Sequence, residues 1–269
     1  MDVTAPAPYP QPAHVDGFGG RRIDWTGRDV IFGLLWFLGL FLLAPIPVVL
    51  PIAAGWGEDS NELYAATFVA SAFAEVALVA VAGFFTFHKY GGSWERLGLV
   101  MPEGRTLLWA LGGFVGALAV SMLYGGMIEL FDINALRTDC AEQIPKEVRD
   151  ERVLMAMAAV TVIMFAPICE EIFFRGFIAT GISRAWGIAA GVVVSGLLFS
   201  GAHFLPKSFL PIALIGMIFA FVYWRSGNLW STVLAHIAFN SLSIALIAGG
   251  SCDTESSAAL TRPLLDWLL

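Results

Sequence analysis

Long apolar runs separated by short polar stretches dominate the chain. A membrane-spanning helix needs about 20 predominantly apolar residues, and about seven runs approach or exceed that length. They are Val30–Ala54, Leu63–Phe87, Leu107–Phe131, a run from Val153 through Phe165 and beyond, Trp186–Phe204, Phe209–Trp224 and Leu229–Ala248. Pro45, Pro47 and Pro51 predict a break in the first run, because proline interrupts helical hydrogen bonding. The pattern predicts an all-α fold, a polytopic membrane helix bundle of about seven to eight transmembrane helices.

The same pattern divides the chain into four segments. Residues 1–24 are rich in proline and glycine and contain no long apolar run, which predicts a disordered N-terminal tail. Residues 25–150 hold the N-terminal transmembrane helices. Residues 151–250 hold most of the ionisable groups that fall within apolar runs, and residues 251–269 form a C-terminal tail.

Composition supports a membrane protein. Hydrophobic residues make up 58% of the chain and charged residues 14%, against about 25% charged in a soluble domain. A soluble globule needs more polar cover, so lipid is the expected solvent and partner. A soluble domain, a disordered chain and a secreted disulfide scaffold are excluded. The net charge of −7 argues against nucleic acid as a partner, because phosphate binding needs a basic patch.

Basic residues indicate the orientation in the membrane. They gather before the first span and in the loops after the second, fourth and sixth spans, at Arg21, Arg22, Arg28, Lys89, Arg96, Arg105, Arg184 and Arg225. Cytoplasmic loops carry an excess of Lys and Arg. The pattern therefore predicts a multi-pass protein of the cell membrane with a cytoplasmic N-terminus and the C-terminus on the opposite side, although the loop at 132–152 is of mixed charge.

The three cysteines fall into two groups. Cys140 and Cys252 lie in a loop and a tail on the predicted non-cytoplasmic side. A disulfide is allowed there, and two free thiols are the alternative. Cys169 lies inside an apolar run, which is typical of a small buried hydrophobe.

Ionisable groups inside membrane spans are costly and are functional candidates by default. Glu170, Glu171 and Arg175 lie in the fourth run. At about 100° per residue, Arg175 is roughly 40° around the helix from Glu171 and roughly 140° from Glu170. The spacing predicts that Glu171 and Arg175 neutralise each other. Glu170, without a cationic partner, is then a candidate general base.

Two further helices carry polar groups at a spacing of four, which puts each pair on one helix face. Phe199 precedes His203 in the fifth run, and His236 precedes Asn240 in the seventh. A lone histidine of this kind is as often a hydrogen-bonded structural residue as a functional one. The three elements together are harder to explain by packing alone.

The combined motifs Glu-Glu-x-x-x-Arg, Phe-x-x-x-His and His-x-x-x-Asn on successive helices resemble the CAAX protease and bacteriocin-processing family (CPBP, or Abi). This family includes the type II CAAX prenyl endopeptidases. The resemblance covers roughly residues 153–248, and Gly227-Asn228-Leu229-Trp230 and Arg96-Leu97-Gly98-Leu99 also look like the family. Residues 151–250 would then be the catalytic core.

The resemblance implies an intramembrane glutamate-type endopeptidase that hydrolyses a peptide bond of a membrane-associated substrate. Glu170 would deprotonate a water that His203 helps to hold. His236 and Asn240 would donate hydrogen bonds to the oxyanion, and such donors contribute strongly to catalysis. Glu171 and Arg175 would position the helix. Phe199 would pack beside His203, and a plain core role is the alternative.

A zinc site formed by Glu170, His203 and His236 is the alternative to a metal-free mechanism. No HExxH motif is present, and relatives of the family use a mechanism that needs no metal. The resemblance therefore implies no cofactor.

Two points stay open at the level of sequence. Counted by helical rise, Glu170, His203 and His236 differ in depth by roughly 15–20 Å, so the helices must be offset, tilted or broken, for example near Pro167 and Pro206. Glu75 lies outside the motifs. It is either a channel residue or a protonated acid that bonds a neighbouring helix.

The main alternative to a peptidase is a non-catalytic membrane protein of the same fold, such as a bacteriocin immunity or scaffold protein. An ion-coupled transporter is less favoured because no repeat symmetry is evident. The resemblance is compatible with a prenylated CAAX-like substrate and with a membrane-associated substrate that carries no prenyl group.

Overall fold

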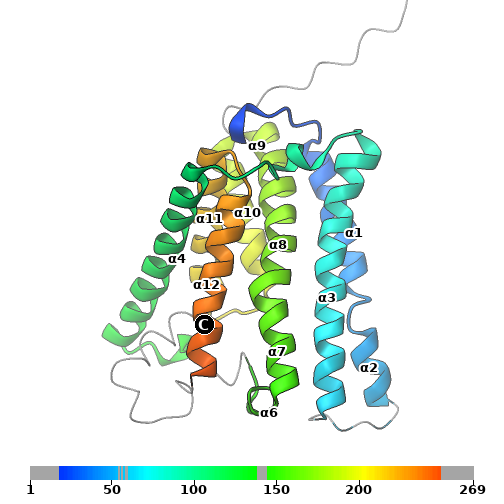
Figure 1. Ribbon diagram of the computed structural model, residues 1–269, viewed down its shortest axis with the longest axis vertical. Coiled ribbons are helices and arrows are strands. Elements are labelled where there is room, and N and C mark those ends of the chain that lie inside the picture. Colours follow the sequence, from blue (N-terminus) through cyan, green and yellow to red (C-terminus); the bar gives the residue numbers. More distant parts are fainter. Residues whose placement is uncertain (1–17, 54, 56, 58–59, 138–143, 250–269) are drawn as a thin grey trace, which may run out of the picture.

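The computed structural model describes residues 18–53, 55, 57, 60–137 and 144–249, and helices of several kinds make up its regular structure (Figure 1). No element of these residues is a strand. The prediction of an all-α membrane helix bundle is confirmed. The elements are η1 Phe18–Gly20, α1 Gly27–Phe41, α2 Ile46–Ala53, α3 Asn61–Gly83, η2 Phe84–Lys89, η3 Trp94–Leu97, α4 Gly104–Leu130, η4 Asn134–Leu136, α6 Lys146–Asp150, α7 Arg152–Val160, η5 Thr161–Phe165, α8 Ala166–Glu170, η6 Glu171–Ala179, α9 Thr180–Trp186, α10 Ile188–Ala202, α11 Phe209–Ser226 and α12 Trp230–Ala248.

Each of the seven apolar runs forms a helical segment. Five helices of the described residues are long and apolar enough to cross a membrane, which makes this a multi-pass membrane protein. They are Asn61–Lys89, Gly104–Leu130, Arg152–Trp186, Phe209–Ser226 and Trp230–Ala248. The apolar helix α10 is shorter. The first run is broken as predicted, into α1 and α2, although Pro51 lies inside α2.

The longest span, Arg152–Trp186, changes its winding along its length. It passes from α7 through the π-helical η5 into α8, and from there into the π-helical η6 and α9. Pro167 lies at the start of α8 and has no N–H to donate to the preceding turn. A wider π turn before a proline is one way in which a helix accommodates the missing bond, and such turns are frequent at functional sites. The second π segment begins at Glu171, in the middle of the sequence motif.

Helix α10 and helix α11 pack closely because small residues face each other. An added Cβ at Gly216 would lie 2.9 Å from Gly196 Cα, so a methyl group does not fit. Gly113 on α4 similarly faces Ala235 on α12, where an added Cβ would lie 3.1 Å from the alanine Cβ. The expectation that small residues serve close helix approach holds for these positions. Gly112, by contrast, has open space.

The main core forms where η6 passes between the N-terminal helices and α10–α11. Figure 1 shows α1 and α3 on one side of the α7–α8–α9 column, and α10, α11, α12 and α4 on the other. Aromatic residues fill the junction: Phe173 and Phe177 of η6 are fully buried and contact Phe37 and Phe85, respectively. This core fixes the position of the helix that carries the glutamate pair.

The segment before α1 is ordered, which corrects one prediction. Residues 1–17 lie outside the described part of the chain, but residues 18–24 do not behave as a tail. Phe18 and Ile23 are fully buried. Arg21 donates hydrogen bonds to Gly227 O and the Tyr223 hydroxyl, and Asp24 pairs with Arg96. The apolar side chains of residues 18–24 anchor this segment to the bundle. The proline and glycine content of the sequence did not indicate this.

A buried carboxylate joins the start of α1 to the end of the second span. Asp29 is 2% exposed and accepts hydrogen bonds from Lys89, Tyr90 and the Thr26 backbone and hydroxyl. Burial and the hydrogen bond to Asp29 raise the pKa of Tyr90, so its phenol stays protonated and donates at neutral pH. The contacts hold α1 beside the helix that carries Glu75.

The family-like segment around Leu97 fastens α11 and α12 to the rest of the bundle. Leu97 O accepts a hydrogen bond from the buried Tyr223 hydroxyl at 2.8 Å, and Leu229 N donates to Gly98 O at 2.8 Å. Gly98 adopts φ +94°, and an added Cβ would lie 2.4 Å from the Tyr223 hydroxyl oxygen. Only glycine fits this position.

We expect Gly98→Ala to destabilise the protein by at least about 1–2 kcal/mol, because alanine pays for the left-handed conformation and also clashes with Tyr223. Gly112→Ala is the matched control, since its site is open and helical, and it should be neutral or up to about 1 kcal/mol stabilising. Thermal unfolding of both variants in the same detergent measures the difference. Equal Tm values for the two variants would contradict the argument.

Candidate active site

Glu170 lies between two histidines that come from different helices. It is the last residue of α8, and its side chain is 13% exposed. Its Oε1 is 3.9 Å from His203 Nε2, and its Oε2 is 3.8 Å from His236 Nε2. The three groups predicted to act together are therefore neighbours, and the depth mismatch counted from ideal helices does not exist in the structure.

His203 reaches Glu170 because α10 ends early. The histidine is the C-cap of this helix, and the next residue, Phe204, has φ +54°. His203 Nδ1 lies 2.8 Å from the Phe199 carbonyl oxygen. A carbonyl can only accept, so Nδ1 carries the proton, and the Nε2 of neutral His203 presents a lone pair to Glu170.

Glu171 forms the ion pair predicted from its spacing. Arg175 Nη1 lies 2.8 Å from Glu171 Oε1, and both side chains are fully buried. The same Oε1 is 3.1 Å from His236 Nδ1, so Glu171 also orients the imidazole of α12. Because Nδ1–H donates to Glu171, the Nε2 of neutral His236 is an acceptor directed at Glu170. The sequence spacing predicted the ion pair but carried no signal for this contact between helices.

Arg175 makes further contacts besides its ion pair with the Glu171 carboxylate. Its Nη2 donates to Gly216 O on α11 at 3.4 Å. Its guanidinium lies 4.1 Å from the ring centroid of Phe199 and 5.5 Å from that of Phe219. Cation–π contacts of a desolvated guanidinium are favourable. Phe219, which also contacts His236 at 5.5 Å between ring centroids, was missed in the sequence, where it looks like any apolar residue of α11.

Phe199 packs beside His203, as expected. The two rings are edge to face, with centroids 4.7 Å apart. Phe199 also contacts Phe174 and His236 at 5.3 Å and 5.8 Å, and it is 3% exposed. It is both a core residue and a wall of the site, so the two alternatives from the sequence are compatible.

Asn240 lies one turn beyond His236 on α12. Its Nδ2 donates a hydrogen bond to Val162 O in the π segment η5 at 2.8 Å. This bond uses one of the two amide protons, and the other is left for a ligand. The amide thus ties α12 to the helix that carries Glu170.

Glu75 lies on α3, which packs against α8, the helix that ends at Glu170. It interacts electrostatically with Glu170, and both carboxylates act on the thiol of Cys169. Glu75 Oε2 is buried and has no hydrogen-bond partner in the described residues. The predicted hydrogen bond to a neighbouring helix is therefore not made by this oxygen.

The described residues contain no group of three or more His, Cys, Asp or Glu side chains with the geometry of a metal site. The zinc alternative, Glu170 with His203 and His236, is not such a group. Cys169 is a buried free thiol, as expected for a small buried hydrophobe. Cys140 and Cys252 lie outside the described residues.

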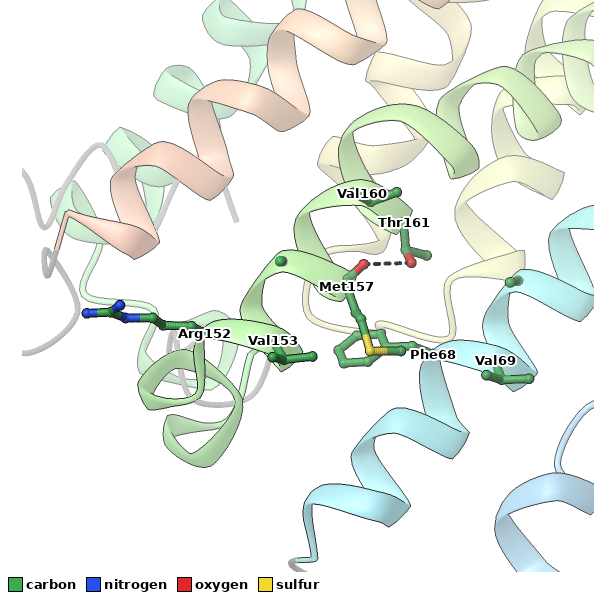
Figure 2. A pocket seen from close by; sticks show the side chains of 9 residues that line it. Phe68, Val69, Arg152, Val153, Met157, Val160 and Thr161 are labelled. Carbon is green, nitrogen blue, oxygen red and sulfur yellow. Dashed lines mark hydrogen bonds between the residues drawn. The ribbon is translucent and has the colours of Figure 1, made fainter.

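An apolar groove of about 540 Å³ runs between α3 and α7. Figure 2 shows Phe68 and Met157 directed toward each other from the two helices, and Arg152 extending away at one end. The groove is lined by Phe68, Val69, Ala72, Arg152, Val153, Ala156, Met157, Val160 and Thr161. Glu75 follows Ala72 by three residues and therefore shares its helix face. On α3 the lining of the groove ends at Ala72, and it includes neither Glu75 nor Glu170.

Comparison with known proteins matches the part of the chain that carries the motifs. The model of a family described as "Type II CAAX prenyl endopeptidase Rce1-like" matches residues 152–242. This match confirms the resemblance over that part of the chain. Glu170, Glu171, Arg175, Phe199, His203, His236 and Asn240 all lie within the matched residues, whereas Glu75 lies outside them.

Two relatives extend the similarity. A protein of Bacillus subtilis (strain 168) named "Putative membrane peptidase YdiL" is 29% identical over 141 residues, which are 52% of this chain and 56% of that protein. An uncharacterized protein of Mycoplasma capricolum subsp. capricolum is 23% identical over 235 residues, 82% of this chain and 68% of that protein. The alignment thus covers little more than half of the Bacillus relative. No solved structure matches the chain.

Glu170 and Glu171 are adjacent in the sequence but differ in their surroundings, and measurements of protein stability can test this difference. We expect Arg175→Ala to lower the stability of the folded protein by about 3–5 kcal/mol, because it leaves the buried Glu171 without its cation. Glu170→Gln should leave folded yield and Tm close to those of the wild type, because Glu170 has no cationic partner to lose. Size-exclusion yield and thermal unfolding in detergent provide the comparison, and equal losses for the two variants would refute this separation.

Proposed function

We propose that this protein is an intramembrane endopeptidase of the glutamate type that hydrolyses a peptide bond of a membrane-associated peptide or protein. The observation that carries the proposal is the convergence of Glu170, His203 Nε2 and His236 Nε2, with 3.8–3.9 Å between the carboxylate oxygens and the two nitrogens. The family match over residues 152–242 and the name of the Bacillus relative support the same class of reaction.

The convergent groups are suited to hold and activate a water. In the tautomers described above, the carboxylate and both Nε2 atoms are acceptors, and a water supplies two donors. Separations of 3.8–3.9 Å are too long for direct hydrogen bonds and fit a molecule held between the groups. In the proposed first step, Glu170 removes a proton from this water. The resulting hydroxide adds to the carbonyl carbon of the scissile bond.

The negative charge that forms on the carbonyl oxygen needs donors. Asn240 provides the amide proton that is not bonded to Val162 O. His236 donates from Nε2 only as an imidazolium, because its Nδ1 proton is engaged by Glu171. This form carries its second proton before the water binds, and the water then donates to Glu170 and His203. The buried Glu171 carboxylate would stabilise that cation, as a carboxylate does for the imidazolium of a serine protease. Oxyanion donors that are fixed in advance make a large contribution in a water-poor site.

The reaction ends when the intermediate collapses. The bond between carbon and nitrogen breaks, and protonated Glu170 returns its proton to the leaving amine. One carboxyl group thus serves as base and then as acid, and the protein regains its starting protonation state. The buried pair of Glu171 and Arg175 takes no proton in this scheme. It holds the helix and His236 in place.

The substrate class follows from the location of the site and from the family. The groups lie on helices of a multi-pass membrane protein, which supports a substrate that is held at the membrane. We propose a peptide or protein tail at the membrane, with a prenylated CAAX-like peptide as the first probe. Lipid is the surrounding partner, the N-terminus is proposed to be cytoplasmic, and nucleic acid is not a proposed partner. A non-catalytic protein of the same fold is the alternative.

The mechanism that we propose uses no metal. The Nδ1 atom of each histidine is hydrogen-bonded to an acceptor of the protein. A carboxylate with an activated water is sufficient for hydrolysis. The zinc alternative makes a different prediction, because removal of the metal would abolish activity.

The first test is cleavage of a farnesylated CAAX peptide by the purified protein in lipid, with and without a strong chelator. We expect the wild type to cleave in both conditions and Glu170→Gln to be inactive although folded, because the amide cannot accept the proton of the water. Mass spectrometry of the products locates the bond. Loss of activity with chelator and rescue by zinc would replace the metal-free mechanism.

The substrate and the reaction class are tested separately. Absence of cleavage of the farnesylated peptide would remove the CAAX-like substrate. Peptide profiles of cells with wild type or Glu170→Gln then test the peptidase itself. Identical profiles would favour the non-catalytic alternative.

The proposed role of Asn240 as a hydrogen-bond donor to the oxyanion leads to a separate prediction. Asn240→Ala should lower kcat by about 10²–10³ with little change in KM, because the lost donor acts mainly on the charge of the intermediate. Ser243→Ala on the same helix is the control, since Ser243 lies farther along α12 and donates to the helix backbone at Phe239 O. Steady-state kinetics of the two variants decide the point, and an unchanged kcat for Asn240→Ala would remove the residue from the mechanism.

A further inference from the structure

Glu75 is an ionisable residue in the middle of a membrane span that the proposed mechanism does not use. It lies on α3, and α3 packs against α8 and η6, the elements that carry Glu170 and Glu171. The family match covers residues 152–242 and does not include Glu75. The family match therefore does not explain why a glutamate is present at position 75, and its role is inferred from its contacts.

If Glu75 and Glu170 were both ionised, neighbouring cations would not neutralise both negative charges. Glu75 and Glu170 interact electrostatically, and Glu75 Oε2 is buried without a hydrogen-bond partner in the described residues. Arg175, the buried cation of η6, is already paired with Glu171 at 2.8 Å. Two carboxylates in one poorly hydrated site cannot both ionise freely, because each anion disfavours the other.

The remaining elements packed on α3 bring no second cation to the pair. Helix α2 and segment η5 contain no ionisable residue. Asp29 of α1 and Lys89 of η2 pair with each other at one end of the span, where Arg28 and His88 also lie. Arg152 of α7 lies at one end of the groove. Helix α6 meets α3 near its first turn, far from Glu75 along the helix. The titratable groups that face the pair are Cys169 of α8 and, across Glu170, His203 and His236.

We propose that Glu75 and Glu170 form a carboxyl pair that shares one proton, and that Glu75 is the positioning residue that keeps Glu170 available as the base. The role of Glu170 as base rests on the proposed function, whereas the shared proton does not. With Glu75 as the neutral member, Glu170 is the one carboxylate beside the histidines that no guanidinium neutralises, since Glu171 is paired with Arg175. The site thereby avoids a second uncompensated anion.

The pair keeps the proton count balanced through the proposed reaction. At rest it holds one proton. When Glu170 removes a proton from water the pair holds two, and the only new negative charge lies on the oxyanion. When Glu170 protonates the leaving amine the pair returns to one proton. Ionisation of Glu75 would place an extra negative charge beside the oxyanion and slow this sequence.

Infrared titration of the full-length protein in lipid nanodiscs tests the pair without any substrate. The carbonyl stretch of protonated carboxyl groups is followed from acid to alkaline pH in the wild type, Glu75→Gln and Glu170→Gln. We expect the pH at which the last carboxylic acid band disappears to fall by about one unit or more in each variant, because each loses its negatively charged neighbour. Glu62→Gln is the matched control, since it removes a carboxyl from the first turn of the same helix.

The control should titrate like the wild type. If the band in Glu170→Gln disappears at the wild-type pH, Glu75 titrates independently and the pair does not exist. This arm decides the proposal even if Glu75→Gln fails to fold.

A kinetic arm then asks whether the pair matters for catalysis. With the farnesylated CAAX peptide, Glu75→Gln should shift the alkaline limb of kcat/KM upward by about one pH unit or more, because no second anion can form beside the oxyanion. A profile that superimposes on that of the wild type would show that Glu75 does not act through Glu170. Failure of wild type to cleave would count against the proposed substrate, and the infrared result would still decide the carboxyl pair.

Discussion

The need to neutralise one buried guanidinium organises the C-terminal half of this protein. Arg175 is fully buried, and an unpaired charge there would cost several kcal/mol. Glu171 supplies the counter-charge, Gly216 O a hydrogen bond and Phe199 a ring face. Because Glu171 also binds His236, one charge requirement joins η6, α10, α11 and α12. The positions of the proposed catalytic groups depend on this network.

Sequence spacing was sufficient for relations within one helix. Helical periodicity predicted that Glu171 and Arg175 pair, and that Phe199 lies beside His203, and both contacts are present. Counting along ideal helices failed for depth, because it ignored the π segments of the long span and the early end of α10 at His203. Local winding is set by proline and tertiary packing, so a constant rise per residue could not find it.

Relations between helices were beyond the sequence. The bond between His236 and Glu171, the contact of Phe219 with Arg175 and the approach of Glu75 to Glu170 join residues far apart in the chain. Each of these residue types occurs often in such segments, and none carries a spacing signal. The packed residues 18–24 were missed for a related reason: a few large apolar side chains decide burial there, although proline and glycine dominate the preceding composition.

The division of labour between two adjacent glutamates follows from helix geometry and a low dielectric. Successive residues point in different directions, so Glu171 faces Arg175 and forms an ion pair with it at 2.8 Å. Glu170 points toward the histidines with no cation of its own, and a carboxylate in that condition is sensitive to every nearby charge. The N-terminal helices are then more than a frame for the site. Through Glu75 on α3, they place a second carboxyl where it interacts electrostatically with Glu170.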